Sequence, residues 1–173
     1  MNHILIASPS RFRFASGVSQ GRVFFKYWLP ALVWMAVIFT ASGDTESAHR
    51  SSTLFEPLLR WLFPHLPLPH IETLHHVFRK LCHLTEYALL ALLLWRALHH
   101  SRDGLSAWSW PKVGGTLLLV FLYSATDEVH QGFVPGRTAQ FSDVLIDTLG
   151  GAIGLLTFWL YRHFRRRFRS PPP

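Results

Sequence analysis

Four side chains that can bind anions or transfer protons fall close together in the sequence: Lys80, His83, Glu86 and Tyr87. On a helix, Lys80, His83 and Tyr87 share one face, because they stand at positions i, i+3 and i+7, and Glu86 lies beside His83. A histidine next to a carboxylate suits general acid–base catalysis, whereas a lysine binds phosphate or carboxylate. We therefore take His83 and Glu86 as candidate catalytic residues, and Lys80 and Tyr87 as candidate substrate-binding residues.

Polar residues also gather where two later apolar stretches approach each other in the sequence. Asp127, Glu128 and Gln131 directly follow one stretch, and Asp143 and Asp147 begin the next, one helical turn apart on a shared face. Asp127 is a second candidate for orienting the histidine, and we count it among the candidate catalytic residues. The other four are candidate substrate-binding residues.

Arg137 is the last candidate binding residue. The turn signal Pro135-Gly136 predicts that its guanidinium projects from a fixed turn, where it matches a phosphate or a carboxylate, including the protein's own aspartates. Ionisable groups at membrane depth cost about 2.5–3.5 kcal/mol each at the centre of a helix. They are therefore either paired into a plug that fixes helix packing or used as a site, and we favour the site.

Composition and charge narrow the classes of ligand and partner. The net charge of +7 comes from basic residues in short segments that flank apolar stretches, which is typical of membrane topology, and we expect no nucleic-acid partner. Eleven histidines include no tight metal-ligand pattern such as His-Glu-x-x-His, so we expect no metal and no cofactor. The single cysteine, Cys82, is expected to be a small apolar helix residue.

The elements that must position these residues are transmembrane helices. Four apolar stretches at 24–41, 81–98, 113–126 and 144–161 have lengths suited to a hydrocarbon layer roughly 30 Å thick, and 49% of the chain is hydrophobic. The cluster at 54–63 predicts a short interfacial helix, and Pro69 suits the start of the second long helix. The expected fold is all-α: a polytopic membrane bundle of about four transmembrane helices with one interfacial helix.

Basic segments set the expected orientation. Residues 1–23, the loop at 96–112 and the tail at 163–173 carry arginine or lysine and alternate correctly for a chain with both termini in the cytoplasm. We therefore expect a multi-pass protein of the cell inner (plasma) membrane, with its transmembrane domain at 24–162 and its polar helix ends outside. Gly150 and Gly154 predict close helix packing, with a homodimer as the second option.

The motif residues resemble the VanZ-like family over roughly residues 24–162. The resemblance rests on Lys80-Leu-Cys-His83, Glu86-Tyr87, Asp127-Glu128-Val-His-Gln131, Pro135-Gly136-Arg137, Asp143-Val144 and the glycines from 150 to 154. Asp147 departs from it, because an asparagine is the more frequent residue there. The resemblance implies a small helical membrane domain associated with resistance to the glycopeptide teicoplanin, and it implies no settled reaction.

Two hypotheses of different classes follow for function. In the first, an outer-leaflet site binds or modifies an anionic, lipid-linked cell-envelope precursor, or shields it from a glycopeptide. In the second, the protein is a non-catalytic membrane scaffold or binding protein whose charged residues are structural ion pairs. The sequence leaves open whether the chain is an enzyme. A proton-coupled transporter is disfavoured, because the cytoplasmic halves of the second and fourth helices are apolar.

Overall fold

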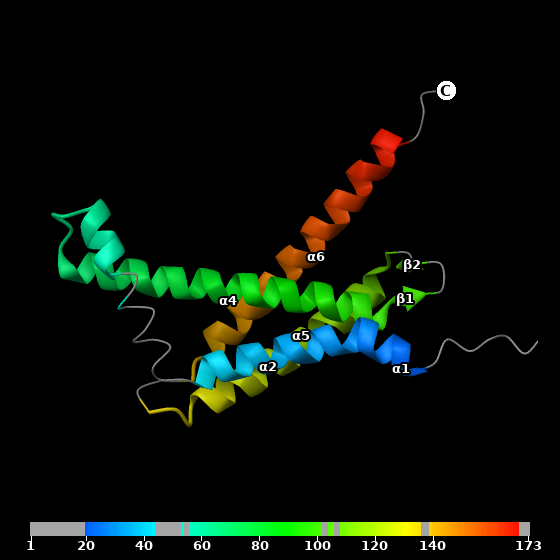
Figure 1. Cartoon of the computed structure of the whole chain (residues 1–173), viewed down its shortest axis with the longest axis horizontal. Coiled ribbons are helices and arrows are strands. Elements are labelled where there is room, and N and C mark those ends of the chain that lie inside the picture. Colours follow the sequence, from blue (N-terminus) through cyan, green and yellow to red (C-terminus); the bar gives the residue numbers. More distant parts are fainter. Residues whose placement is uncertain are drawn as a thin grey trace, which may run out of the picture.

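Long helices dominate the computed structural model, which describes residues 20–43, 53, 56–101, 104–105, 108–135 and 139–169 (Figure 1). The elements in chain order are α1 (Gln20–Val23), the π-helical turn η1 (Phe24–Trp28), α2 (Leu29–Gly43), α4 (Leu68–Leu98), β1 (His100–Ser101), β2 (Gly104–Leu105), α5 (Trp110–Gln131) and α6 (Phe141–Arg169). The expected all-α membrane bundle is confirmed, apart from a two-residue antiparallel pair in which His100 lies opposite Leu105.

Within the described residues, three helical spans are long and apolar enough to cross a membrane: Gly21–Ser42, Leu68–Leu98 and Phe141–Phe168. The sequence predicts a fourth span, and α5 occupies its place with a lower hydropathy. The reason lies in the side chains that α5 buries, which include Thr116, Ser124, Asp127, Glu128 and Gln131. Most of its exposed side chains are apolar, among them Leu118, Leu122 and Val129, so α5 presents a lipid-compatible outer face.

Helices α4 and α6 are both longer than their apolar stretches. Pro69 lies in the first turn of α4, as predicted, and the helix continues from there without a Pro or Gly to Leu98. The segment from 68 to 80 is therefore helical although it is polar. The basic residues after Tyr161 likewise extend α6 to Arg169.

The closest helix contact joins α4 and α6, which cross obliquely (Figure 1). Gly150 and Gly154 are buried at this crossing, and a methyl group at Gly154 would lie only 2.7 Å from the carbonyl oxygen of Ala88. The two glycines thus let the α6 backbone approach the α4 backbone, as the sequence predicts. The face of α6 that carries these glycines therefore packs against α4 of the same chain.

Two hydrogen bonds between distant segments fasten α2 to the other helices. Trp34 Nε1 donates to the carbonyl oxygen of Glu86 on α4 at 2.9 Å. Tyr123 on α5 donates its hydroxyl to the carbonyl oxygen of Met35 at 2.5 Å. Because hydrogen bonds gain strength where water is excluded, these contacts fix the position of α2 relative to α4 and α5.

The N-terminal part of α4 and the short helix at residues 56–62 project beyond the other helices (Figure 1). This helix lies within the predicted interfacial segment, of which residues 54 and 55 fall outside the described residues. Leu59 and Ile71 are buried, whereas Trp61, Leu62 and Phe63 are at least half exposed. The exposed apolar side chains suit a helix that lies on a membrane surface.

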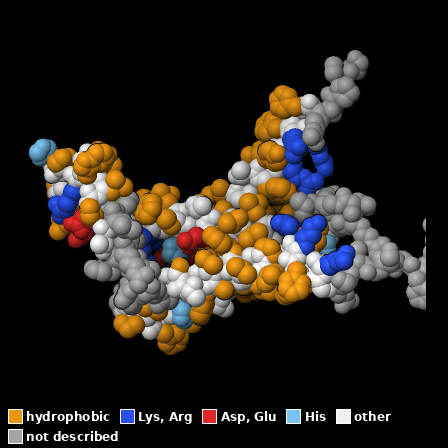
Figure 2. Space-filling view, in the orientation of Figure 1, with side chains coloured by type: hydrophobic (Ala, Val, Ile, Leu, Met, Phe, Trp, Pro, Cys, Tyr) orange, Lys and Arg blue, Asp and Glu red, His pale blue; other side chains and the backbone are white. Residues whose placement is uncertain are grey.

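Acidic side chains gather toward one end of the described helices, whereas basic side chains occur at both ends. Figure 2 shows acidic side chains near the middle of the view and blue side chains gathered around the C-terminal half of α6 and the start of the first helix. The sequence explains this separation: of the ten Asp and Glu residues, only Asp103 lies outside residues 44–86 and 127–147. In the part of the chain that the structure describes, every carboxylate therefore lies within residues 56–86 or 127–147.

Candidate functional site

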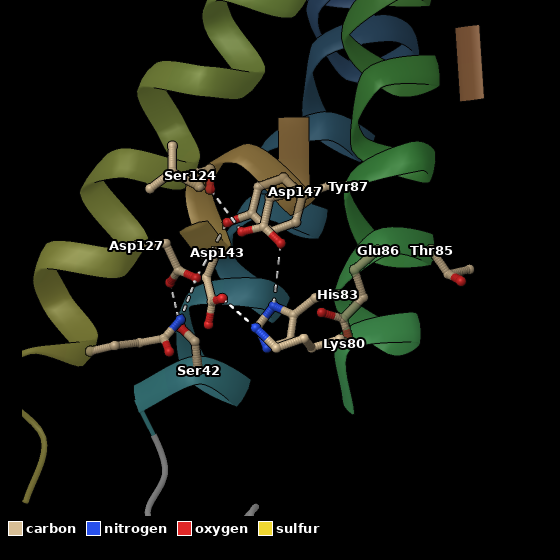
Figure 3. Close-up of polar contacts among 12 residues, drawn as sticks. Ser42, Lys80, His83, Thr85, Glu86, Tyr87, Ser124, Asp127, Asp143 and Asp147 are labelled. Carbon is tan, nitrogen blue, oxygen red and sulfur yellow. Dashed lines mark hydrogen bonds and ion pairs between the residues drawn. The ribbon is translucent and has the colours of Figure 1, made fainter. Parts of the chain in front are cut away.

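Polar side chains from every long helix converge at one level of the bundle (Figure 3). The C-terminal ends of α2 and α5, the first turns of α6 and the middle of α4 meet there. The converging residues are Ser42 on α2; Lys80, His83 and Tyr87 on α4; Ser124, Asp127, Glu128 and Gln131 on α5; and Asp143 and Asp147 on α6. We call Asp127, Glu128, Asp143 and Asp147 the carboxylate cluster.

Asp127 is buried, with 1% of its surface exposed, and accepts hydrogen bonds from three helices. Ser42 Oγ on α2 donates to Oδ1, and Tyr87 OH on α4 donates to Oδ2 at 3.3 Å. Gln131 Nε2, one turn further along α5, donates to Oδ2 at 3.0 Å. All three donors are uncharged groups, so neutral hydrogen bonds hold Asp127 in place.

Asp147 is also buried, and it lies between α5 and α4. Its Oδ2 accepts a hydrogen bond from Ser124 Oγ at 2.7 Å, and its Oδ1 lies 3.8 Å from His83 Nδ1. That second distance is within reach of an ion pair when the imidazole is protonated, and it is too long for a hydrogen bond. His83 and Asp147 therefore form a loose histidine–carboxylate pair (Figure 3).

The carboxylate beside His83 differs from the two that the sequence suggested. The sequence reasoning gave the orienting role to Glu86 or Asp127, whereas the structure places Asp147 nearest to the imidazole. Asp127 is engaged with its three hydrogen-bond donors. The backbone carbonyl of Glu86 takes part in fastening α2, and no ion pair of its carboxylate occurs among the described residues.

Lys80 and Asp143 form the accessible part of the site. Lys80 Nζ lies 2.5 Å from Asp143 Oδ1, and the two side chains keep 31% and 35% of their surface exposed. The His83 side chain keeps 25%, whereas Asp127 and Asp147 are nearly fully buried. We call Lys80, His83 and Asp143 the rim and Asp127 and Asp147 the floor. Only the rim is open to a ligand in this arrangement.

Glu128 has a local structural contact. Its Oε1 accepts a hydrogen bond from the backbone N–H of Gln140 at 2.5 Å, and its side chain is buried. This contact ties the segment just before α6 to the last turn of α5. The segment leads back to Arg137, which lies outside the described residues, as does Gly136 of its predicted turn.

Sequence reasoning missed the two serines of the site. Ser42 ends the first apolar helix, and Ser124 lies one turn before Asp127, so both positions were visible as hydroxyls next to the polar helix ends. A serine in a membrane helix usually satisfies itself on its own backbone, which is why the pattern carries little signal. Here each serine bonds a carboxylate of another helix, and Ser42 Oγ also lies 3.1 Å from the carbonyl oxygen of Phe39 on its own helix.

The chemistry available is anion binding and proton transfer. In the part of the chain that the structure describes, no group of three or more His, Cys, Asp and Glu side chains is arranged to hold a metal ion. Lys80 can bind an anion electrostatically, and His83 can exchange a proton while Asp147 stabilises its charged form.

Comparison with known proteins identifies one family. A family model described as VanZ/LLP1 matches residues 26–162, a range that includes every residue of the rim and the floor. No curated protein matches the chain, and no solved structure matches it.

Proposed function

The chain belongs to the VanZ/LLP1 family, and on that premise we propose that its rim binds the anionic head of a lipid-linked cell-envelope molecule. The association of VanZ-like proteins with teicoplanin resistance supports an envelope ligand. Membrane-spanning helices around the site support a ligand that is itself held in the bilayer. Binding either shields the envelope molecule from a glycopeptide or prepares it for modification.

The observation that carries this proposal is the division of the site into a buried floor and an accessible rim. An ion-paired plug has no need for solvent access, yet Lys80 and Asp143 both remain about one-third exposed. A phosphate arriving from the membrane surface replaces Asp143 as the partner of Lys80, and this exchange costs little because the pair is already partly hydrated. Arg137 is the second cation that the sequence assigns to this ligand.

In a catalytic form of the proposal, His83 transfers the proton. Asp147 stabilises the imidazolium that forms when His83 acts as a base, and Ser124 holds Asp147 in place through its hydroxyl. Asp127 then has a supporting part, because its hydrogen bonds join α2, α4 and α5 below the rim. Binding alone requires Lys80 but no proton transfer by His83.

The proposed orientation puts the rim in the outer leaflet of the inner membrane and both termini in the cytoplasm. Basic residues support it, since Figure 2 shows blue side chains gathered around the C-terminal half of α6 and the start of the first helix, away from the red side chains in the middle of the view. Cytoplasmic segments of membrane proteins carry an excess of lysine and arginine. A reporter fused to either terminus tests this orientation.

The second candidate function is a membrane scaffold in which the whole cluster is structural. The hydrogen bonds of Asp127 favour it, because a carboxylate that already accepts three donors is satisfied without a ligand. The two candidates agree about the floor and differ about the rim. Rim variants therefore decide between them.

The deciding experiment compares two lipids that differ only in one phosphate. Purified protein in detergent is titrated with a polyprenyl phosphate and with the polyprenol of the same chain length, and binding is followed by native mass spectrometry. Lys80→Gln removes the ammonium group that is proposed to bind the lipid phosphate. Arg60→Gln is the matched control, because Arg60 pairs with Glu56 on the short helix outside the cluster.

We expect the phosphate-bearing lipid to bind the natural protein and Arg60→Gln, and to bind Lys80→Gln about tenfold more weakly, which corresponds to one charge-assisted contact. Cells that carry the natural chain should tolerate more teicoplanin than cells that carry Lys80→Gln. Equal binding of the two lipids, or a folded Lys80→Gln protein with unchanged binding and tolerance, would show that the rim is structural.

A further inference from the structure

A second polar feature lies at the other end of the helices, away from the carboxylate cluster. Between the start of α5 and the C-terminal half of α6 there is a pocket of about 80 Å³, roughly two to three times the space that one water occupies in the liquid. Its lining residues are Trp108, Trp159, Arg162, His163 and Arg166. The site proposed above uses none of them.

The helical spacing explains how α6 builds one wall of this pocket. Trp159, Arg162, His163 and Arg166 stand at positions i, i+3, i+4 and i+7, so they share one face of the helix. The rings of Trp159 and His163 stack at a centroid distance of 5.4 Å. Trp108 faces them from the segment before α5, with its ring 6.4 Å from that of Trp159.

The pocket is rich in hydrogen-bond donors and positive charge. Two guanidinium groups, an imidazole and two indoles line it, and none of the described lining side chains is a carboxylate. The indole nitrogen of Trp108 is buried and has no hydrogen-bond acceptor among the residues that the structure describes. The sequence from residue 148 to the C-terminus also contains no Asp or Glu. A ligand with negatively charged acceptor oxygens complements these groups.

We propose that this pocket binds a phosphate group, and that an anionic lipid headgroup supplies it. Arginine recognises phosphate oxygens through its planar set of donors, and tryptophan favours the boundary between hydrocarbon and water. Exposed apolar side chains at Leu156, Leu160 and Phe164 continue along α6 from this level, where acyl chains can lie. If the arginines of α6 served only to set the membrane orientation, they would not need to line a pocket.

The test compares two pairs of arginines on the same stretch of α6. Arg162→Gln with Arg166→Gln removes the two pocket cations. Arg165→Gln with Arg167→Gln removes the same charge from positions that do not line the pocket, and it changes the loop charge that sets membrane orientation equally. Thermal stability in detergent without added ligand shows that both double variants are folded.

Each protein is titrated with dihexanoyl phosphatidylglycerol, with dihexanoyl phosphatidylcholine and with inorganic phosphate, and the dissociation constants are compared. We expect the anionic lipid to bind the natural protein in preference to the zwitterionic lipid. The pocket variant should bind it roughly thirtyfold more weakly, and the control pair within about twofold of the natural protein.

The phosphate arm identifies the source of the group. If inorganic phosphate binds in a way that depends on Arg162 and Arg166, the pocket is a phosphate site. If the anionic lipid then binds no more tightly than inorganic phosphate, the natural ligand is free phosphate. A preference for the anionic lipid over inorganic phosphate assigns it to the headgroup. Equal losses in the two double variants, or no preference for the anionic lipid and no phosphate binding, would overturn the proposal. The loss caused by Arg162→Gln with Arg166→Gln should be the same in the Lys80→Gln background as in the natural background, which separates this site from the rim.

Discussion

Replacing Gly150 by alanine should push α4 and α6 apart at the point that sets the geometry of the rim. Gly150 is buried on α6, and the atom that a side chain would meet first belongs to the backbone of Leu84. Leu84 directly follows His83 on α4, and Gly150 lies about one helical turn after Asp147 on α6. A displacement here therefore changes the separation of His83 and Asp147.

The structure gives the size of the effect. The new Cβ would lie 2.9 Å from Leu84 Cα, whereas nonbonded carbon atoms sit about 3.5–4.0 Å apart, so the helices must separate by several tenths of an ångström or more. Overpacking costs about 1–3 kcal/mol, and the upper part of this range applies because a backbone atom cannot rotate away. Alanine recovers about 1 kcal/mol of helix propensity. The expected net loss is about 2 kcal/mol.

Gly115→Ala is the matched control. Gly115 lies inside α5, and a Cβ added there meets nothing within 4 Å. The same substitution should therefore stabilise the protein by up to about 1 kcal/mol through helix propensity alone. Reversible unfolding in mixed micelles of dodecyl maltoside and sodium dodecyl sulfate measures both free energies of unfolding.

The reasoning predicts a further change in ligand binding. If Gly150→Ala separates the two helices, lipid binding at the rim should weaken together with stability, while Gly115→Ala leaves binding unchanged. A Gly150→Ala protein as stable as the Gly115→Ala protein would refute the close backbone contact at this crossing.

Three further predictions concern single groups. In a double-mutant cycle of Lys80→Met with Asp143→Asn, unfolding free energies should give a coupling of about 1 kcal/mol, since the pair is partly exposed; additive effects would contradict the ion pair. Asp127→Ala should cost about 1–3 kcal/mol, because buried donors lose their acceptor, and adding Tyr87→Phe should recover part of the loss by removing one stranded hydroxyl. Burial lowers the pKa of His99 in the folded protein below its ordinary 6.5. The stability that its neutral ring contributes is therefore present above pH 6.5 and is lost as the pH falls through the lower folded-state pKa. His99→Gln should flatten this part of a curve of unfolding free energy against pH.

The sequence predicted which residues converge better than it predicted how they pair. Spacing on one helix shows that Lys80, His83 and Tyr87 share a face, and the rule that polar helix ends lie together brought Asp127 and Asp147 to the same level. Periodicity cannot tell which neighbouring helix stands opposite a given side chain. Asp147 rather than Glu86 lies nearest to the imidazole for that reason.

Helix extents were predicted less well than helix number, because hydropathy marks only the apolar part of a helix. Pro69 marked the start of α4 correctly, whereas hydropathy marked only 81–98, because residues 70–80 mix polar and apolar side chains. α5 likewise extends beyond its apolar stretch at 113–126, because Asp127 to Gln131 continue the helix. Average hydropathy does not distinguish a buried polar face from an exposed one, and Ser124 and Asp127 lower the average while their side chains point inward.

The length of α4 makes the protein sensitive to bilayer thickness. A helix of 31 residues is about 46 Å long, whereas the hydrocarbon layer is about 30 Å thick, so α4 must tilt or emerge from it. Gly150 and Gly154 hold α4 against α6 near its middle, and a change of tilt pivots α4 about that contact. Lys80 lies on the far side of the pivot from the loop after Leu98. Lipid tail length, through hydrophobic mismatch, therefore alters the distance between Lys80 and Asp143.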